Sequence, residues 1–281
     1  MQELIEKYFM YYAIGAMAIF FIFWKIIPSL RKVKKITKIL SGKIHFNKNS
    51  DISKEQYKKL AIGAIYSQQQ TAYINSLTTG LGKSNIRELL SKWWGINNTN
   101  EAWEKLDYLA EKGFRYYFKT VLKAYQATGK EEQEKIILNG FDENNEKYEE
   151  DIQKAYQQLV YLQETWKELT ENNIVLTEEE LIKYNNIGWD CGRLVFLSRL
   201  CFDAGYISEN EVWIYIDQAY ELAANNFENW TAFSKSYIIG RGMWGGTSSG
   251  NEGIISIAEK LLNEEKSPWV QLNLAIFYNT T

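Results

Sequence analysis

Residues 152–166 read Ile-Gln-Lys-Ala-Tyr-Gln-Gln-Leu-Val-Tyr-Leu-Gln-Glu-Thr-Trp, and this stretch decides the fold class. Its apolar side chains recur at steps of three and four residues, which is the spacing of one face of an α-helix. The members of the stripe are Ile152, Ala155, Tyr156, Leu159, Leu162 and Trp166. The pattern predicts an amphipathic helix over 145–171, and no part of the sequence shows the alternation that is typical of a strand.

Helix-start signals recur on both sides of that stretch. Each places a Ser, Thr or Asn three residues before a Glu or Gln, so that the first side chain accepts a backbone N–H and the second reaches back. The pairs are Ser53 with Gln56, Asn98 with Glu101, Thr177 with Glu180 and Ser208 with Glu211. We therefore predict an all-α domain over 53–281, with helices near 54–76, 85–94, 101–112, 114–128, 131–138, 145–171, 178–204, 209–227, 230–243, 252–264 and 268–278.

The composition excludes several classes of protein. The chain has 281 residues, of which 46% are hydrophobic and 24% charged, so it is an ordinary globular mixture and not a disordered chain. A single His and two Cys exclude a zinc finger, a His-rich metal centre and a disulfide scaffold within one chain. We expect no metal site and no cofactor.

The segment from Tyr8 to Trp24 carries no charged residue. Lys25 can extend its amine to the headgroups, so Ile26 and Ile27 can join the span and bring it close to the ~30 Å of a bilayer core. A cleaved signal peptide fits poorly, because residues 1–7 carry two Glu against one Lys. We predict a single transmembrane helix within an N-terminal anchor, residues 1–27, with residues 8–27 in the bilayer.

Charge divides the chain sharply after that span. Residues 25–43 hold seven basic side chains and no acidic one, whereas residues 44–281 carry a net charge of −9. The excess of Lys and Arg after the span predicts that the rest of the chain faces the cytoplasm. We interpret 28–52 as a basic juxtamembrane segment and linker, with residues 25–43 on the anionic lipid surface. The acidic domain would repel a phosphate backbone, so we do not expect a nucleic-acid partner.

Two possible ion pairs lie in the predicted helix 178–204. Asp190 and Arg193 are three residues apart and share one helix face, and Arg199 and Asp203 are four apart and form a second possible pair. Asp190 and Arg199 point to opposite sides of that helix, so the pairs are not expected to act together. Two roles stay open for them: buried ion pairs that fix packing, or part of an active site.

A glycine-rich stretch follows, with five Gly within residues 240–250. It could offer backbone N–H groups to an anion beside Arg241, although it lacks the Lys and the spacing of a P-loop. The alternative is a helix end in which Gly240 and Gly242 permit close packing against Trp244 and Arg241 caps carbonyl groups. No catalytic residue can be assigned. The candidate polar cluster, functional or structural, is Trp189, Asp190, Arg193, Arg199, Asp203, Gly240, Arg241 and Trp244.

Gly-Trp-Asp-Cys-Gly-Arg at 188–193 and Ser-Tyr-Ile-Ile-Gly-Arg at 236–241 resemble the motifs of the bacterial domain-of-unknown-function family 1266. The segment Leu89–Ile96, which ends in Trp-Gly-Ile, is similar to the N-terminal half of that family, and the resemblance covers roughly 60–250. Phe114 stands where the family leads us to expect a His after Gly113, so a role for that His does not carry over. The resemblance implies a bacterial helical domain without an established activity, so the membrane of the predicted anchor would be the bacterial inner membrane.

Two functions are compatible with these observations. The first is a membrane-anchored, cytoplasm-facing interaction module that binds and neutralises a protein partner such as a toxin, because an acidic surface steers basic partners. The alternative is an enzyme that acts on a phosphorylated small molecule through the Asp and Arg cluster, since arginine forks match phosphate. The lack of a catalytic set favours the module over the enzyme.

Overall fold

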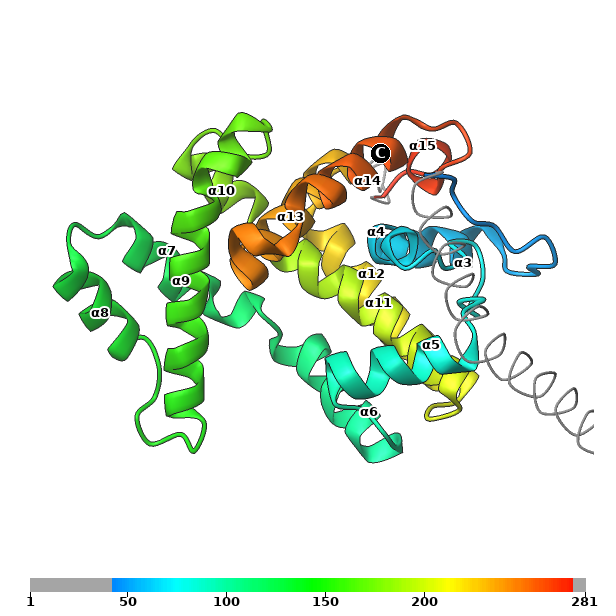
Figure 1. The fold of residues 1–281 in the computed structure, drawn as a ribbon, viewed down its shortest axis with the longest axis horizontal. Coiled ribbons are helices and arrows are strands. Elements are labelled where there is room, and N and C mark those ends of the chain that lie inside the picture. The colour runs from blue at the N-terminus through cyan, green and yellow to red at the C-terminus, as the bar shows by residue number, and fades with distance from the viewer. Residues whose placement is uncertain (1–41, 275–281) are drawn as a thin grey trace, which may run out of the picture. The chain divides into compact units, whose positions relative to one another are not determined.

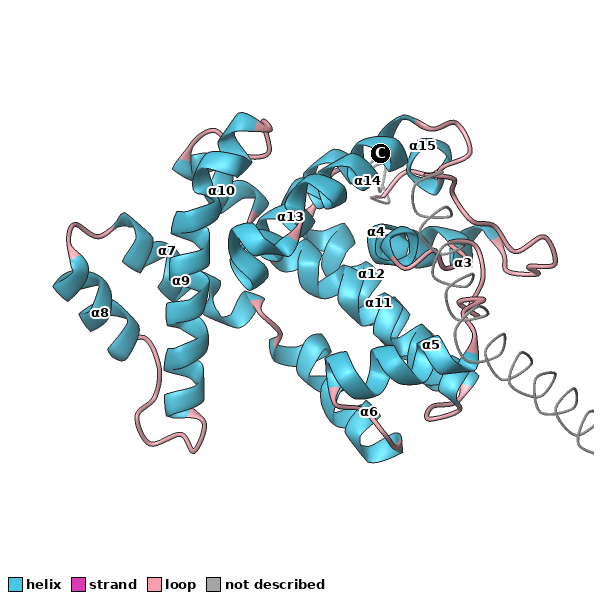
Figure 2. Ribbon diagram, viewed as in Figure 1, coloured by secondary structure: helices cyan, strands magenta, loops and turns pink. Residues whose placement is uncertain are grey.

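The computed structural model of the protein describes residues 42–274, and within this range every regular element is a helix and none is a strand (Figures 1 and 2). The predicted all-α fold is confirmed for these residues. The chain divides after Lys43, and the residues from Ile44 onward belong to one compact unit. The predicted anchor at 8–27 lies outside the described residues. Among the helices within 42–274, none combines the length and hydropathy needed to cross a bilayer.

Two of the elements are π-helical segments, η3 and η4, which each continue a preceding α-helix. Two others, η2 and η5, are 3₁₀ turns. In chain order the elements are α3 (Lys54–Leu60), η2 (Ala61–Gly63), α4 (Ala64–Gln69), α5 (Lys83–Glu88), η3 (Leu89–Trp94), α6 (Thr99–Asp107), η4 (Tyr108–Lys112), α7 (Arg115–Gln126), α8 (Lys130–Leu138), α9 (Tyr148–Glu171), α10 (Glu178–Tyr184), α11 (Ile187–Ala204), α12 (Glu209–Asn226), α13 (Trp230–Gly245), η5 (Gly246–Ser249), α14 (Asn251–Asn263) and α15 (Pro268–Gln271).

Helix α11 forms the centre of this unit. Every residue from Gly188 to Cys201 is buried, because α12, α13, α4 and η2 pack around it. Figure 1 shows α11 running between the α12 and α5 ribbons, with α13 crossing near its beginning. A helix that is apolar on all sides belongs in a core. The few charged side chains of α11 must therefore find their partners inside the protein.

Glycines let α11 and α13 approach closely. A Cβ atom on Gly188 would lie 2.9 Å from the Phe233 carbonyl oxygen, and one on Gly192 would lie 2.5 Å from the Tyr237 ring. In the opposite direction, a Cβ atom on Gly240 would lie 2.4 Å from Trp189 Cβ. Gly240 therefore permits close packing as expected, but its neighbour is Trp189.

Helices α7, α8 and α9 form a second packed group, with α9 also lying against α13 (Figure 1). The apolar stripe of 152–166 explains this arrangement, because Ile152, Ala155, Leu159 and Leu162 are all buried. The predicted helix over 145–171 is confirmed, and it begins at Tyr148.

Three predicted helix boundaries are wrong. The single helix over 178–204 is two helices, because Asn185 takes φ 47° and ψ −155° between α10 and α11. The motif Gly-Trp-Asp thus lies in the first turn of α11 and not in the middle of a long helix. The predicted helix 54–76 ends at Gln69, and the last described helix ends at Gln271.

The predicted capping pairs all begin helices, in two versions. Ser53 with Gln56 and Ser208 with Glu211 are complete capping boxes. At α6 and α10 the Asn and Thr side chains cap as predicted, but the later Glu carboxylate accepts the N–H of the residue before the cap, at 2.6 Å from Asn97 N and 2.7 Å from Leu176 N.

Candidate functional site

The Asp190 carboxylate is completely enclosed and accepts hydrogen bonds from every side. The backbone N–H groups of Phe114 and Arg115 donate to it at 3.0 and 2.9 Å. The guanidinium groups of Arg115, at 3.2 Å, and of Arg193 complete the set. The predicted pairing of Asp190 with Arg193 is confirmed. Because its oxygens already accept four donors, this carboxylate holds the beginning of α7 against α11.

Gly113 makes the contact between α7 and Asp190 possible. Its φ of 59° with ψ −165° is a conformation that L side chains rarely adopt, and a Cβ atom there would lie 2.3 Å from Asp190 Oδ2. The next residue, Phe114, contributes its backbone N–H and its ring. The position where the family resemblance led us to expect a His thus presents no titratable side chain to the carboxylate.

Arg115 links α7 to the π-helical segment before it. Its Nη1 donates to the Leu109 carbonyl at 2.7 Å, and its Nη2 donates to the Ala110 carbonyl. Carbonyl groups near a helix end lack partners within the helix, and Arg115 supplies them. Asp190, Arg115 and η4 therefore form one connected set of hydrogen bonds between three elements.

Arg199 and Asp203 do not form the ion pair that their spacing suggested. Arg199 is fully buried and donates to the Leu77 carbonyl at 3.1 Å and to Ser67 Oγ at 2.8 Å, and its Nη2 donates to two more carbonyls in the 73–78 segment. Asp203 accepts from the N–H and the hydroxyl of Thr79. Both side chains hold the loop between α4 and α5, and burial lowers the pKa of Arg199 to about 10.

Arg193 lies on a different side of α11 from Arg199, among aromatic rings. Its guanidinium carbon is 4.8 Å from the centre of the Trp189 ring, 5.2 Å from Phe114 and 5.8 Å from Trp94. Trp94 is supplied by the π-helical segment η3 and Phe114 by the start of α7. Such stacked arrangements stabilise a cation at the ring faces.

Arg241 approaches the same indole from α13. Its guanidinium carbon is 5.5 Å from the Trp189 ring and 4.7 Å from the Trp244 ring, and Trp244 is 39% exposed. Burial lowers the pKa of Arg241, and Arg193 adds a smaller effect in the same direction. Arg241 remains charged at neutral pH, since guanidinium groups do not deprotonate there. The Trp189 ring therefore lies close to two arginine side chains.

The first half of the glycine-rich stretch is helical, as the predicted helix 230–243 and the helix-end alternative expected. Gly240, Arg241 and Trp244 lie inside α13, which continues to Gly245, and the turn begins only at Gly246. Arg241 therefore takes its position from a helix face.

Three buried donors around this centre have no hydrogen-bond partner within the described part of the chain. They are Arg193 Nε, Trp189 Nε1 and Tyr237 Oη. Tyr237 contacts Trp189 edge to face, with ring centroids 5.0 Å apart. Burial raises the pKa of the Tyr237 phenol, so this group stays protonated and can donate. We call these three residues together with Arg241 the arginine–tryptophan centre. Buried polar groups without protein partners usually bind water or an ion.

Of the eight candidate residues, Trp189, Arg193, Arg241 and Trp244 converge on this centre, with Asp190 and Gly240 supporting it. Arg199 and Asp203 lie elsewhere and have structural partners. Sequence reasoning missed Tyr237. The available signal was the spacing of four residues in Trp189/Arg193 and Tyr237/Arg241, which places an aromatic ring and an arginine on one face of each helix.

The fold and this centre define a helical domain with a buried, positively charged aromatic site. Residues 89–274 match the family described as "Protein of unknown function (DUF1266)", and since the match covers more than half of the chain, the protein belongs to that family. The match begins later and ends later than the resemblance over 60–250. Neither curated proteins nor solved structures gave a match.

Proposed function

We propose that this protein is a membrane-anchored binding module that recognises an anionic group at its arginine–tryptophan centre. One observation carries the proposal: Arg193, Trp189 and Tyr237 each bury a donor that has no partner in the described residues. Donors of this kind with no acceptor opposite them match the oxygens of a phosphate or carboxylate.

The charges around the centre support the same ligand class. Arg115 and Arg193 bring two positive charges, and one carboxylate, that of Asp190, accepts from both. An arginine excess in a buried place costs solvation free energy, and an anion offsets that cost.

Asp190, the aspartate that the enzyme alternative would use as a general base, is poorly placed for that role. A general base needs an oxygen within reach of the substrate proton, and the Asp190 oxygens accept from Phe114, Arg115 and Arg193. The geometry thus favours binding of an anionic group over chemistry on it.

A titration with inorganic phosphate and pyrophosphate, followed by thermal unfolding, tests the proposal. We expect the melting temperature to rise with ligand in the native chain. Tyr237→Phe removes one unpartnered hydroxyl and should diminish the rise. Tyr117→Phe is the matched control, because Tyr117 donates to Asp151 at 2.7 Å and lies outside the centre. An equal ligand response in all three proteins would refute the anion site.

Membrane anchoring is the second part of the proposal. The span 8–27, which carries no charge from Tyr8 to Trp24, and the basic residues 25–43 support a single-pass protein of a bacterial inner membrane with its helical domain in the cytoplasm. Fractionation tests it: the full chain should pellet with membranes and resist extraction at high salt. Recovery in the supernatant without detergent would contradict the anchor.

We favour a protein partner, such as a toxin to be neutralised, as the source of the anionic group. The net charge of −9 on residues 44–281 supports steering of a basic protein, and a carboxylate or phosphate on that protein would then enter the centre. Affinity purification from detergent extracts should retain a partner at stoichiometry with the native chain and less of it with Tyr237→Phe. Equal retention of the partner by both proteins would show that the partner does not bind through the arginine–tryptophan centre.

A further inference from the structure

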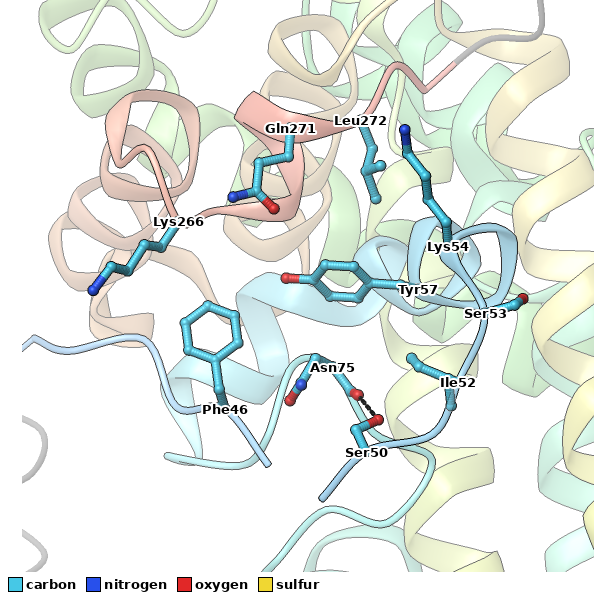
Figure 3. Close-up of a pocket in the computed structure, with 10 residues that line it drawn as sticks. All are labelled: Phe46, Ser50, Ile52, Ser53, Lys54, Tyr57, Asn75, Lys266, Gln271 and Leu272. Carbon is cyan, nitrogen blue, oxygen red and sulfur yellow. Dashed lines mark hydrogen bonds between the residues drawn. The ribbon is translucent and has the colours of Figure 1, made fainter. Parts of the chain in front are cut away.

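A cavity lies where the linker, α3 and α15 meet, and none of its lining residues belongs to the arginine–tryptophan centre. It has a volume of about 580 Å³, which is within the range of small-molecule sites. Figure 3 shows the Tyr57 ring lying across the middle of it, with its hydroxyl pointing between Phe46 and Lys266. The residues that line it are Phe46, Ser50, Ile52, Ser53, Lys54, Tyr57, Asn75, Lys266, Gln271 and Leu272.

The side chains that line the cavity are positively charged, whereas the domain as a whole is negatively charged. It contains Lys54 and Lys266 and no Asp or Glu, although residues 44–281 carry a net charge of −9. Within the described residues, neither of these lysines forms an ion pair, whereas six other lysines of the domain pair with carboxylates. Two ammonium groups without carboxylate partners at one cavity favour an anionic ligand.

A buried hydroxyl supports the same conclusion. Tyr57 Oη is buried and has no hydrogen-bond partner within the described residues. Burial raises the pKa of this phenol, so it stays protonated and can donate. The other polar groups already have partners: Asn75 bonds the Asn47 backbone at 2.7 and 3.0 Å, and Gln271 Nε2 donates to the Glu265 carbonyl at 2.9 Å. Tyr57 and the two lysines are thus donors available to a ligand.

Apolar side chains line the rest of the cavity. Phe46, Ile52 and Leu272 surround the Tyr57 ring in Figure 3. A ligand that satisfies both parts of the lining carries an anionic group next to a hydrocarbon part. A free phosphate would contact the donors but not the apolar side chains.

The place of the cavity in the chain points to the source of such a ligand. Phe46 follows Lys43, the last basic residue of the predicted lipid-surface segment, by three residues. Three residues of extended chain span at most about 11 Å. If residues 25–43 lie on the anionic surface, the cavity is held within reach of the lipid headgroups.

We propose that this cavity binds the phosphate-bearing headgroup of an anionic phospholipid, with Lys54, Lys266 and the Tyr57 hydroxyl on the phosphate and the apolar lining on the glycerol and first acyl carbons. The inference rests on the proposed membrane anchoring. It gives the domain a second contact with the membrane besides the anchor.

Native mass spectrometry of the full chain, released from micelles that contain phosphatidylglycerol, tests the site by counting bound lipids. The native chain should retain one lipid that the double variant Lys54→Ser/Lys266→Ser loses, with affinity reduced about tenfold or more because two charge-assisted hydrogen bonds disappear. Tyr57→Phe should weaken the same lipid to a smaller extent.

The groove between α7 and α8 supplies the matched control. It has a volume of about 480 Å³ and presents Lys119, Lys123 and Lys135, together with Glu132. The double variant Lys119→Ser/Lys135→Ser removes the same charge and should keep the lipid. Equal losses in the two double variants, or none in either, would overturn the proposal.

Further experiments distinguish a lipid from a soluble phosphate as the ligand, and they test this site separately from the proposed membrane anchor. Glycerol phosphate added as a soluble competitor should displace the lipid only weakly, and displacement as strong as that by phosphatidylglycerol would assign the site to a soluble phosphate instead. If a chain that ends at Leu274 gains the lipid and the native chain lacks it, residues 275–281 fill the cavity and the proposal fails. Fractionation of the native chain and of the Lys54→Ser/Lys266→Ser variant tests the membrane anchor independently of the cavity. Both proteins should pellet with membranes through residues 8–27.

Discussion

Arg193 and Arg199 lie on the same helix, α11, and both are buried, yet their surroundings differ completely. Arg199 donates to Ser67 and to carbonyl groups of the loop between α4 and α5, so its hydrogen bonds are made within the protein. Arg193 pairs with Asp190 but leaves its Nε without a partner in the described residues, beside two more unpartnered donors. Burial alone therefore does not separate a structural arginine from a binding arginine. The two kinds of arginine are distinguished by whether each buried donor has an acceptor within the protein.

Asp190→Asn should have the largest effect on the Arg193 side. The change leaves Arg115 and Arg193 buried without their carboxylate and weakens the cap on α7, so we expect the free energy of unfolding to fall by about 3–5 kcal/mol. Urea unfolding measures this loss, and we expect the slope of the unfolding free energy against urea concentration to stay unchanged. A loss below about 1 kcal/mol would mean that solvent reaches this carboxylate, because exposed pairs are worth that little.

Arg199→Met tests the other side of the comparison. It removes the donors of the carbonyls at Leu77, Tyr73 and Thr78, and we expect a loss of about 2–4 kcal/mol in unfolding free energy. Anion binding at the arginine–tryptophan centre should be unchanged, as measured by the phosphate titration. If the phosphate response disappears in a folded Arg199→Met protein, the two sides are not independent.

Gly113→Ala should destabilise by about 2–3 kcal/mol, through an unfavourable backbone conformation and a clash with Asp190. Gly95→Ala is its control, because Gly95 has a φ of 67° but nothing lies within 4 Å of the added Cβ atom. Its cost should be limited to about 1–2 kcal/mol of backbone strain. Thermal unfolding of both variants gives the comparison, and equal losses would show that the Asp190 contact is not tight.

The smallest effects should come from two tyrosine hydroxyls. Tyr117→Phe removes a hydrogen bond to Asp151 and should cost about 1–1.5 kcal/mol. Tyr237→Phe, measured without ligand, should change stability by less than about 0.5 kcal/mol or increase it, because the lost hydroxyl has no partner among the described residues. A loss for Tyr237→Phe as large as that for Tyr117→Phe would place a protein acceptor at this hydroxyl.

Local patterns were enough to predict the helices but not the partners of their buried charges. The stripe from Ile152 to Trp166 and the cap at Ser208 depend on neighbours within a few residues, and both predictions were confirmed. The break at Asn185 was missed because α13 stabilises it: Ser236 Oγ accepts the Gly188 N–H at 2.8 Å, a contact across 48 residues.

The candidate cluster was predicted in part for the same reason. The spacing of Asp190 and Arg193 revealed their pairing, since both lie on one helix face. The partners of Arg199 lie more than 120 residues away in the chain, so its spacing from Asp203 suggested the wrong contact. Tyr237 was passed over because an unpartnered hydroxyl is a property of three-dimensional packing, which one sequence does not contain.

A crystal structure of the full chain in detergent, grown with inorganic phosphate and at a resolution that shows ordered water, tests the central claim most directly. The account predicts tetrahedral density within hydrogen-bond distance of Arg193 Nε and of at least one of Trp189 Nε1 and Tyr237 Oη. Apolar packing or protein acceptors around all three atoms, with no density between them, would contradict it.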